Sequence, residues 1–207
     1  MRRFFFLGVD LAVVLFSLWI HDRARVRMAA RLGDNEAASR QRSADNPFAR
    51  VDWIGSILLP AFLIVRGQAI LGWTRFLDLD HDRLRRPCRD GLLVAASGPL
   101  ANLFLALAGI AACRGLAVAG LMGSQFFSHV VPFFCAANAS LAVFNLLPIP
   151  PLAASMAAEL FLEGDALSAF EDIKPYGFLL LLAGAYLNFF DFITMPLNRL
   201  VYSLMGF

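Results

Sequence analysis

The sequence predicts an all-α integral membrane protein with about five transmembrane helices. Of its 207 residues, 59% are hydrophobic and only 16% are charged, and the mean hydropathy is +0.65. A soluble domain carries about 25% charged residues. The apolar residues also gather in runs close to the roughly 20 residues that a helix needs to cross a bilayer. Together these observations exclude a soluble domain and a disordered chain.

Five apolar runs are the candidate spans, at residues 4–32, 53–73, 91–112, 126–147 and 176–195. The first run lacks the small-residue cleavage site of a signal peptide, so we expect it to remain as a span. A short amphipathic helix is expected at residues 153–162. We therefore expect one multi-pass, membrane-embedded domain over residues 1–207.

The charges give no sign of a nucleic-acid partner. The net charge is only +2, and the basic residues form two clusters rather than one stripe. Because those clusters place similar numbers of Arg and Lys on the two sides of the membrane, the positive-inside rule leaves the orientation open. We interpret Cys88, Cys113 and Cys135, which lie far apart, as free thiols.

Several polar side chains fall inside the first apolar run. Asp10, Ser17, His21 and Arg25 share one face of a helix, and Asp22 follows His21. An ionisable group inside a membrane span costs several kcal/mol and is a functional hypothesis by default. We therefore expect this face to point into the protein.

Amides and prolines mark the third and fourth runs. Prolines cannot continue a helix, and irregular backbone at membrane depth is tolerated only against protein or a water-filled cavity. The alternative for each asparagine is a simple hydrogen bond between helices. We expect the following residues to line a cavity: Asn102, Asn138, Asn145, Pro148 and Pro150.

In order and spacing, segments along nearly the whole chain resemble the motifs of the site-2 protease family of intramembrane zinc metalloproteases. Arg50 departs from the family, which often has His there. The matching segments are His21-Asp-Arg-Ala-Arg25, Leu32-Gly-Asp34, Asn46-Pro-Phe48, Val51-Asp52, Gly55-Ser-Ile-Leu-Leu-Pro60, Leu71-Gly-Trp73, Arg89-Asp90, Gly98-Pro99 with Asn102, Asn145-Leu-Leu-Pro-Ile-Pro-Pro-Leu152 and Pro175-Tyr-Gly-Phe178.

The resemblance implies a site-2 protease-like helix bundle and a zinc site, but the site is degenerate here. The family's HExxH motif supplies two His ligands and a Glu base, and an Asp of its LDG motif is the third ligand. His21 is retained, whereas Asp22, Arg25 and Ala153 replace the base and the other two ligands. We hypothesise that the Arg25 guanidinium takes the metal position and pairs with Asp22 or Asp10, and we expect no metal and no catalytic residue.

Other zinc donors are scarce. His81, His129 and Cys135 are the remaining candidates, and none lies at an HExxH-like spacing from another. A relocated zinc site stays open as an alternative.

Three functions remain open at this point. The first is a catalytically inactive homologue, a pseudoprotease, that binds transmembrane helices of another protein or serves as a structural subunit of a larger membrane complex. The second is an active zinc metalloprotease that cleaves membrane-anchored substrates. The third is a small transporter or channel, suggested by the intramembrane charges of Asp10, Arg66 and Asp191, although the sequence shows no internal repeats. Membrane lipids are expected contacts, and the resemblance implies a bacterial cytoplasmic membrane.

Overall fold

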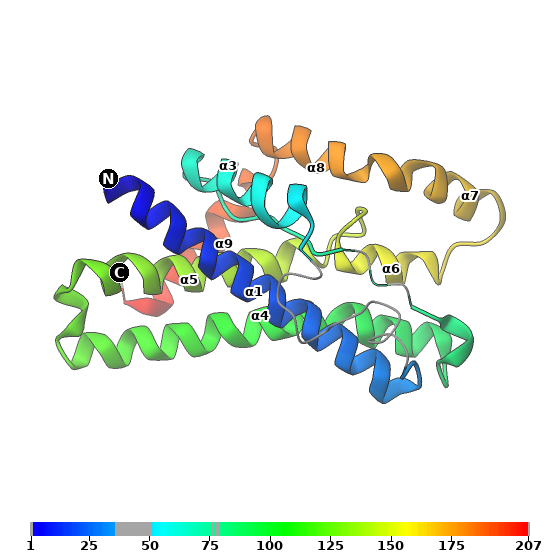
Figure 1. Ribbon diagram of the computed structural model, residues 1–207, viewed down its shortest axis with the longest axis horizontal. Helices are drawn as coiled ribbons and strands as arrows, with labels where there is room; N and C mark the ends of the chain where they lie inside the picture. Colours follow the sequence, from blue (N-terminus) through cyan, green and yellow to red (C-terminus); the bar gives the residue numbers. More distant parts are fainter. Residues whose placement is uncertain (1, 36–50, 76, 78, 207) are drawn as a thin grey trace.

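The computed structural model describes residues 2–35, 51–75, 77 and 79–206. Every regular element in this part of the chain is helical, which confirms the all-α prediction (Figure 1). The α-helices are α1 (Arg2–Leu32), α3 (Leu59–Arg66), α4 (Pro87–Val118), α5 (Gln125–Phe144), α6 (Ala153–Glu159), α7 (Gly164–Ile173), α8 (Gly177–Tyr186) and α9 (Asp191–Met205). A π-helical turn, Trp53–Leu58, precedes α3, and 3-10 turns lie at His81–Arg83, Leu121–Gly123 and Lys174–Tyr176.

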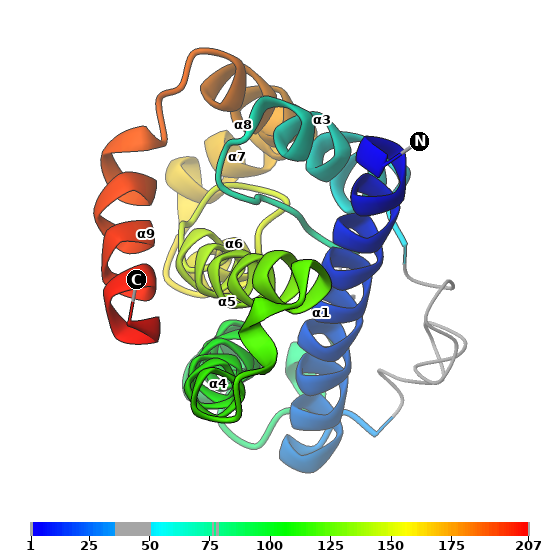
Figure 2. The same cartoon turned by 90° about the vertical axis from the view of Figure 1, so that its left-hand side faces the viewer.

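Among the described residues, three helices are long and apolar enough to cross a membrane: α1, α4 and α5. These helices pack against one another, and α9 lies against α5 on the side away from α1 (Figure 2). The number of spanning segments rises to four if α7, α8 and α9 form one broken span. The chain is therefore an integral membrane protein by helix length and composition, and the count of five spans stays a prediction.

The second predicted span, residues 53–73, is not one helix. Helix ends at Arg66, where Gly67 takes a left-handed conformation with φ 67° and caps it. The π-helical turn of 6 residues and α3 of 8 residues reach roughly 20 Å, less than the bilayer core. The chain then turns back, and the Trp73 N–H donates to the Gly55 C=O at 3.2 Å. Apolar composition alone concealed this reversal. We call residues 68–75 the return segment.

The fifth predicted span, residues 176–195, is also interrupted. Helix α8 ends at Tyr186, α9 begins at Asp191, and the helical segments on either side are bent by 68°. Asn188 lies between them with φ 57°, a left-handed conformation that asparagine tolerates better than most residues. Hydropathy gives little sign of this break, because Leu187, Phe189 and Phe190 around Asn188 are apolar.

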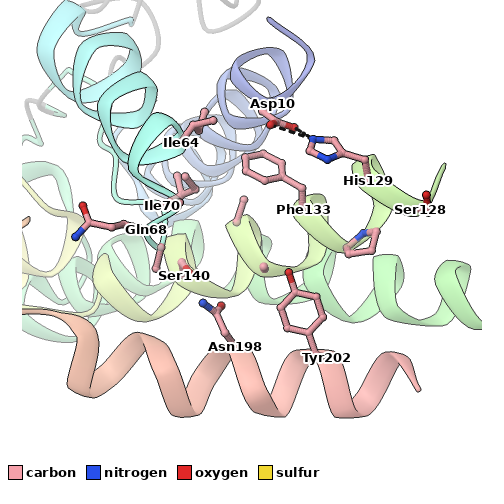
Figure 3. A pocket seen from close by; sticks show the side chains of 15 residues that line it. Asp10, Ile64, Gln68, Ile70, Ser128, His129, Phe133, Ser140, Asn198 and Tyr202 are labelled. Carbon is pink, nitrogen blue, oxygen red and sulfur yellow. Dashed lines mark hydrogen bonds and ion pairs between the residues drawn. The ribbon is translucent and has the colours of Figure 1, made fainter. Parts of the chain in front are cut away.

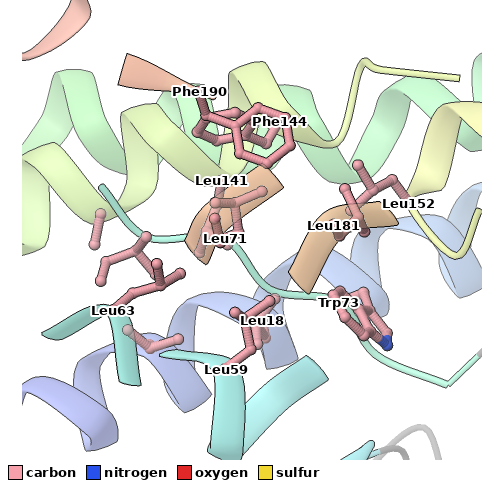
Figure 4. Close-up of a cluster of buried hydrophobic side chains, with 14 residues drawn as sticks. Leu18, Leu59, Leu63, Leu71, Trp73, Leu141, Phe144, Leu152, Leu181 and Phe190 are labelled. Carbon is pink, nitrogen blue, oxygen red and sulfur yellow. The ribbon is translucent and has the colours of Figure 1, made fainter. Parts of the chain in front are cut away.

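A buried apolar core joins the short helices to the long ones. Leu18, Leu63, Leu141 and Leu181 are each at most 1% exposed and belong to one cluster that also includes Trp73 (Figure 4). These residues come from α1, α3, α5, α8 and the return segment. The hydrophobic effect therefore holds the reversed chain against α1 and α5 without requiring it to span.

The fourth predicted span, residues 126–147, and the proline-rich segment after it also differ from expectation. Helix α5 ends at Phe144, before the predicted boundary at residue 147, and no strand is assigned at residues 145–152. The prolines remove the donors that a helix or strand needs. The Leu152 N–H donates to the Ile149 C=O at 2.9 Å, so the segment is a turn that leads into α6. The motif at Asn46-Pro-Phe48 and the departure at Arg50 lie outside the described residues.

Candidate functional site

His21 lies in the middle of the bundle and is 2% exposed. Its Nδ1 contacts Asn102 Oδ1 of α4 at 2.6 Å, and since an amide oxygen only accepts, Nδ1 is the donor. The other face of the ring lies on Gly98, where an added Cβ would come within 2.6 Å of the ring's Cδ2 and Cε1. Gly98 therefore fixes how closely α4 approaches the histidine.

A chain of amide hydrogen bonds extends from His21 across three helices. The Asn102 amide donates to Asn138 Oδ1 of α5 at 2.9 Å, and the Asn138 amide donates to the Ser17 hydroxyl of α1 at 2.9 Å. Ser17, Asn102 and Asn138 are 0% exposed, and His21 is 2% exposed. A fully satisfied network of this kind rigidifies a bundle and fixes the orientation of the imidazole.

Asp22 faces the return segment. The Thr74 hydroxyl donates to Asp22 Oδ1 at 3.2 Å, and both side chains are buried. The reversal of the chain after Gly67 is what brings Thr74 to this position. Sequence reasoning missed Thr74 because it placed residue 73 at the end of a span.

Arg25 is buried one helical turn beyond His21 and is only 4% exposed. Its guanidinium Nη2 donates to the Met156 sulfur of α6, the helix that begins at Ala153. The predicted pairing of Arg25 with Asp10 is wrong: Asp10 lies roughly 22 Å away along α1 and contacts His129 instead. The alternative pairing with Asp22 stays a prediction.

Asn145 holds the start of α6 in place. Its amide donates to the Gly72 C=O at 3.2 Å, and its Oδ1 accepts from the Ala153 N–H at 3.3 Å. Its own C=O accepts from the Ala154 N–H at 3.0 Å. Asn145 thus connects the end of α5, the return segment and the start of α6 at Ala153, the position that the motif resemblance pairs with the family's third ligand. The amide is a structural clamp on the site.

The cavity-lining role assigned to the asparagines and prolines stays a prediction. The amides of Asn102, Asn138 and Asn145 all bond to protein groups, as described above. Pro148 is exposed and Pro150 is buried. Pro150 packs closely on Gly177: a Cβ added to Gly177 would lie 2.7 Å from the carbonyl carbon of Pro150. A cavity of about 530 Å³ lies elsewhere in the bundle and is lined by other residues (Figure 3).

The side chains around His21 do not fit a catalytic zinc site. Such a site needs three protein ligands and an open position. Within the described ranges, no group of three or more His, Cys, Asp or Glu side chains lies together. His21 and Asp22 are the donors present, and the space towards α6 holds the Arg25 guanidinium and the Met156 thioether. A guanidinium cannot be deprotonated to bind a metal.

The alternative donors lie apart from His21. His129 contacts Asp10 at 2.9 Å, near the opposite end of α1, and Cys135 is buried in an apolar cluster with Cys113. The side chain of His81 lies outside the described part of the chain. The relocated zinc site therefore gains no support from His129 or Cys135.

The chain is similar to two curated bacterial proteins. "Putative zinc metalloprotease YwhC" of Bacillus subtilis (strain 168) is 29% identical over 173 residues, covering 82% of this chain and 76% of that protein. "Putative zinc metalloprotease Rip2" of Mycolicibacterium smegmatis (strain ATCC 700084 / mc(2)155) is 28% identical over 204 residues, covering 97% of this chain and 73% of that protein. No family model and no solved structure matches. Both relatives are site-2 protease family members, which confirms the resemblance seen in the ordered motifs.

Proposed function

We propose that this chain is a catalytically silent homologue of the site-2 proteases, which binds transmembrane segments of another membrane protein or serves as a subunit of a membrane complex. The observation that carries the proposal is the buried Arg25 guanidinium at the second ligand position, directed at Met156 beside the third. An arginine that is 4% exposed is a fixed part of the site rather than a surface side chain.

Electrostatics oppose a dication beside Arg25. Two unit charges 4 Å apart interact by about 4 kcal/mol at an effective dielectric constant of 20, and a dication doubles this repulsion. The guanidinium stays protonated at any accessible pH, so the repulsion persists. With Ala153 at the third position, one imidazole and one carboxylate remain to offset it.

The base position also departs from the reaction's requirement. Asp22 is one methylene shorter than Glu, and a displacement of about 1 Å can cost on the order of 100-fold in rate. Its carboxylate accepts from Thr74, which holds it towards the return segment. The chain therefore retains the scaffold of the site while the groups needed for metal-assisted hydrolysis are replaced.

The structure retains features that suit a binding role. The hydrogen bonds from His21 to Ser17 hold α1, α4 and α5 in one arrangement without a metal. After α5, Leu146 and Pro148 are exposed on backbone outside any regular element. Such backbone offers main-chain groups to an unwound segment of a partner. We place the protein in a bacterial cytoplasmic membrane because the two relatives are bacterial.

Zinc content and a restored triple variant test the silent site. The wild-type chain, purified in mild detergent, should hold far less than one zinc per chain. The variant Asp22→Glu/Arg25→His/Ala153→Asp should approach one zinc, because it regains three ligands and loses the buried cation. Arg27→His, an exposed change on the same helix, is the matched control and should gain none. Stoichiometric zinc in the wild type that disappears with His21→Ala would overturn the proposal.

Partner binding is tested separately by co-purification. Tagged chain extracted in mild detergent should bring down the same membrane protein repeatedly, in an amount near equimolar. A protein that always elutes alone as a monomer contradicts the binding role, even if the zinc experiment succeeds.

An active zinc metalloprotease is the second candidate, favoured by the printed names of both relatives and by the retained His21. It predicts cleavage of a membrane-anchored substrate that a chelator stops and that His21→Ala abolishes. Absence of cleavage by the wild type, together with cleavage by the triple variant, favours the silent homologue.

A further inference from the structure

Two adjoining cavities lie where α1 and α5 begin and α3 ends. The inner cavity measures about 530 Å³ and the outer cavity about 1130 Å³. They share Asp10, Ile64, Ser128 and His129, so these four residues lie between the two cavities. Neither is lined by His21, Arg25 or the asparagine network, which places this region apart from the degenerate protease site.

A buried carboxylate marks the junction of the two cavities. The Asp10 side chain is 5% exposed, and His129 Nε2 lies 2.9 Å from its Oδ1 and 3.1 Å from its Oδ2 (Figure 3). The imidazole itself is 38% exposed. The imidazole donates one proton to the carboxylate, whose remaining lone pairs can accept from a second donor. A carboxylate at this depth calls for a cation.

The inner cavity also collects polar atoms that lack partners. Within the described part of the chain, Gln68 Oε1, Ser140 Oγ and Asn198 Oδ1 are buried without a hydrogen bond, and all three residues line this cavity. They come from the return segment, α5 and α9, and Ser140 is only 1% exposed. A buried polar atom without a partner costs about 1–3 kcal/mol. Because the three residues line one cavity, rotation of their side chains towards it would pair these oxygens with an occupant that donates hydrogen bonds.

The walls between the two polar ends are apolar. Ile64, Ile70, Phe133 and Ala137 line the inner cavity, and Figure 3 shows Phe133 beneath Asp10. His129 and Ser140 lie on one face of α5, roughly 16 Å apart at about 1.5 Å per residue. Among the described residues that line the inner cavity there is no Lys or Arg, and the outer cavity is lined by one, Arg3. The cavity is thus elongated, apolar along its length and supplied with acceptors at both ends.

We propose that the inner cavity binds a small organic cation, a primary amine carried on a slender apolar chain. The ammonium pairs with the Asp10 carboxylate, and a donor group at the other end meets Gln68, Ser140 and Asn198. The volume falls in the range of about 300–1,000 Å³ that small-molecule sites occupy, with the usual apolar lining and few polar groups. An anion would be repelled by Asp10, and a fully apolar ligand would leave the acceptors unpaired.

Binding of straight-chain probes to the full chain in detergent tests the proposal. The probes are diaminodecane, aminodecanol, decanediol and decanedioate, which share one chain length and differ in charge. At about pH 8, where an alkyl ammonium is charged, the two amines should bind at least tenfold more tightly than the diol. The dianion should not bind. Equal binding of the diol and the amines, or binding of none of the four, overturns the proposal.

Variants locate the site within the chain. Asp10→Asn should remove the preference for amines, whereas Asp165→Asn, the same change at an exposed position on α7, should leave it intact. Ser140→Ala should weaken the binding of diaminodecane about three- to tenfold, because one hydrogen bond to the probe is lost. If Asp10→Asn fails to fold, the binding of diaminodecane to Ser140→Ala tests the site instead. Amine binding unaffected by both cavity variants would place the ligand elsewhere and refute the assignment.

The source of the amine is resolved by competition. Nanodiscs that contain phosphatidylethanolamine should displace diaminodecane if the natural ligand is an aminolipid headgroup, whereas phosphatidylcholine nanodiscs should not. Displacement by neither lipid, with retained binding of free amines, assigns the cavity to a small soluble amine. Both results support an ammonium site.

Discussion

Gly98 gives the sharpest test of the site's geometry, because it lies directly beneath the His21 ring. An added Cβ would approach Cδ2 and Cε1 of the imidazole to 2.6 Å, whereas ordinary contacts begin near 3.4 Å. Gly98→Ala therefore forces the ring or α4 to move by about 1 Å. Inserting a methyl group into a packed interior costs about 1–3 kcal/mol.

The same helix supplies a matched control. Gly115 also lies within α4 but is exposed, and a Cβ there meets nothing within 4 Å. Gly115→Ala should stabilise the chain by about 0.5–1 kcal/mol through helix propensity alone. Because both substitutions carry that gain, the difference in unfolding free energy between the two variants isolates the crowding cost at His21.

Unfolding in mixed detergent micelles, followed by circular dichroism, measures this difference. We expect Gly98→Ala to be less stable than Gly115→Ala by about 1–3 kcal/mol, or several degrees in midpoint temperature. Adding His21→Ala to Gly98→Ala should recover most of the crowding cost, because the ring that is displaced is gone. Equal stability of the two glycine variants would refute the placement of His21 against α4.

Three further predictions follow from the fold. Asn145→Ala should lower the free energy of unfolding by about 1–3 kcal/mol, because the Ala153 N–H loses its acceptor. A shallower unfolding transition with an unchanged midpoint would contradict the role of Asn145 as a structural clamp. A thiol reagent should label Cys88 in the folded chain, whereas Cys113 and Cys135 should react only after denaturation; mass spectrometry of the labelled protein distinguishes them. Gly67→Ala should cost about 1 kcal/mol in a thermal melt, because its left-handed backbone penalises a Cβ although no atom lies near; an unchanged melt would argue that α3 continues past this residue.

The interruptions in the second and fifth predicted spans were missed for the same reason. Hydropathy counts apolar residues and does not distinguish a helix that crosses the membrane from apolar backbone that reverses beside it. A left-handed residue lies at each interruption: Gly67 at the reversal after α3 and Asn188 at the bend between α8 and α9. A glycine followed by a glutamine at position 68 was a turn signal in the second run.

The site was partly accessible from local pattern. The spacing of His21 and Arg25 placed both on one helix face, and both are buried as expected. Asn102 and Asn138 were singled out as amides in apolar helices, and the structure joins them to each other. Which partner each would choose could not be predicted, because side chains on different helices meet only through packing.

The sequence by itself determined the helical membrane class, the resemblance to the site-2 protease motifs and the residue types at Arg25 and Ala153, because composition, order and identity are local properties of the chain. Tertiary structure alone decided that Arg25 reaches Met156 and that Asp10 contacts His129, pairs separated by 131 and 119 residues. Neither contact could be predicted from the periodicity of the sequence, because each depends on how α1 packs against α5 and α6. The packing of those helices converted a row of polar side chains on one helix into two separate sites.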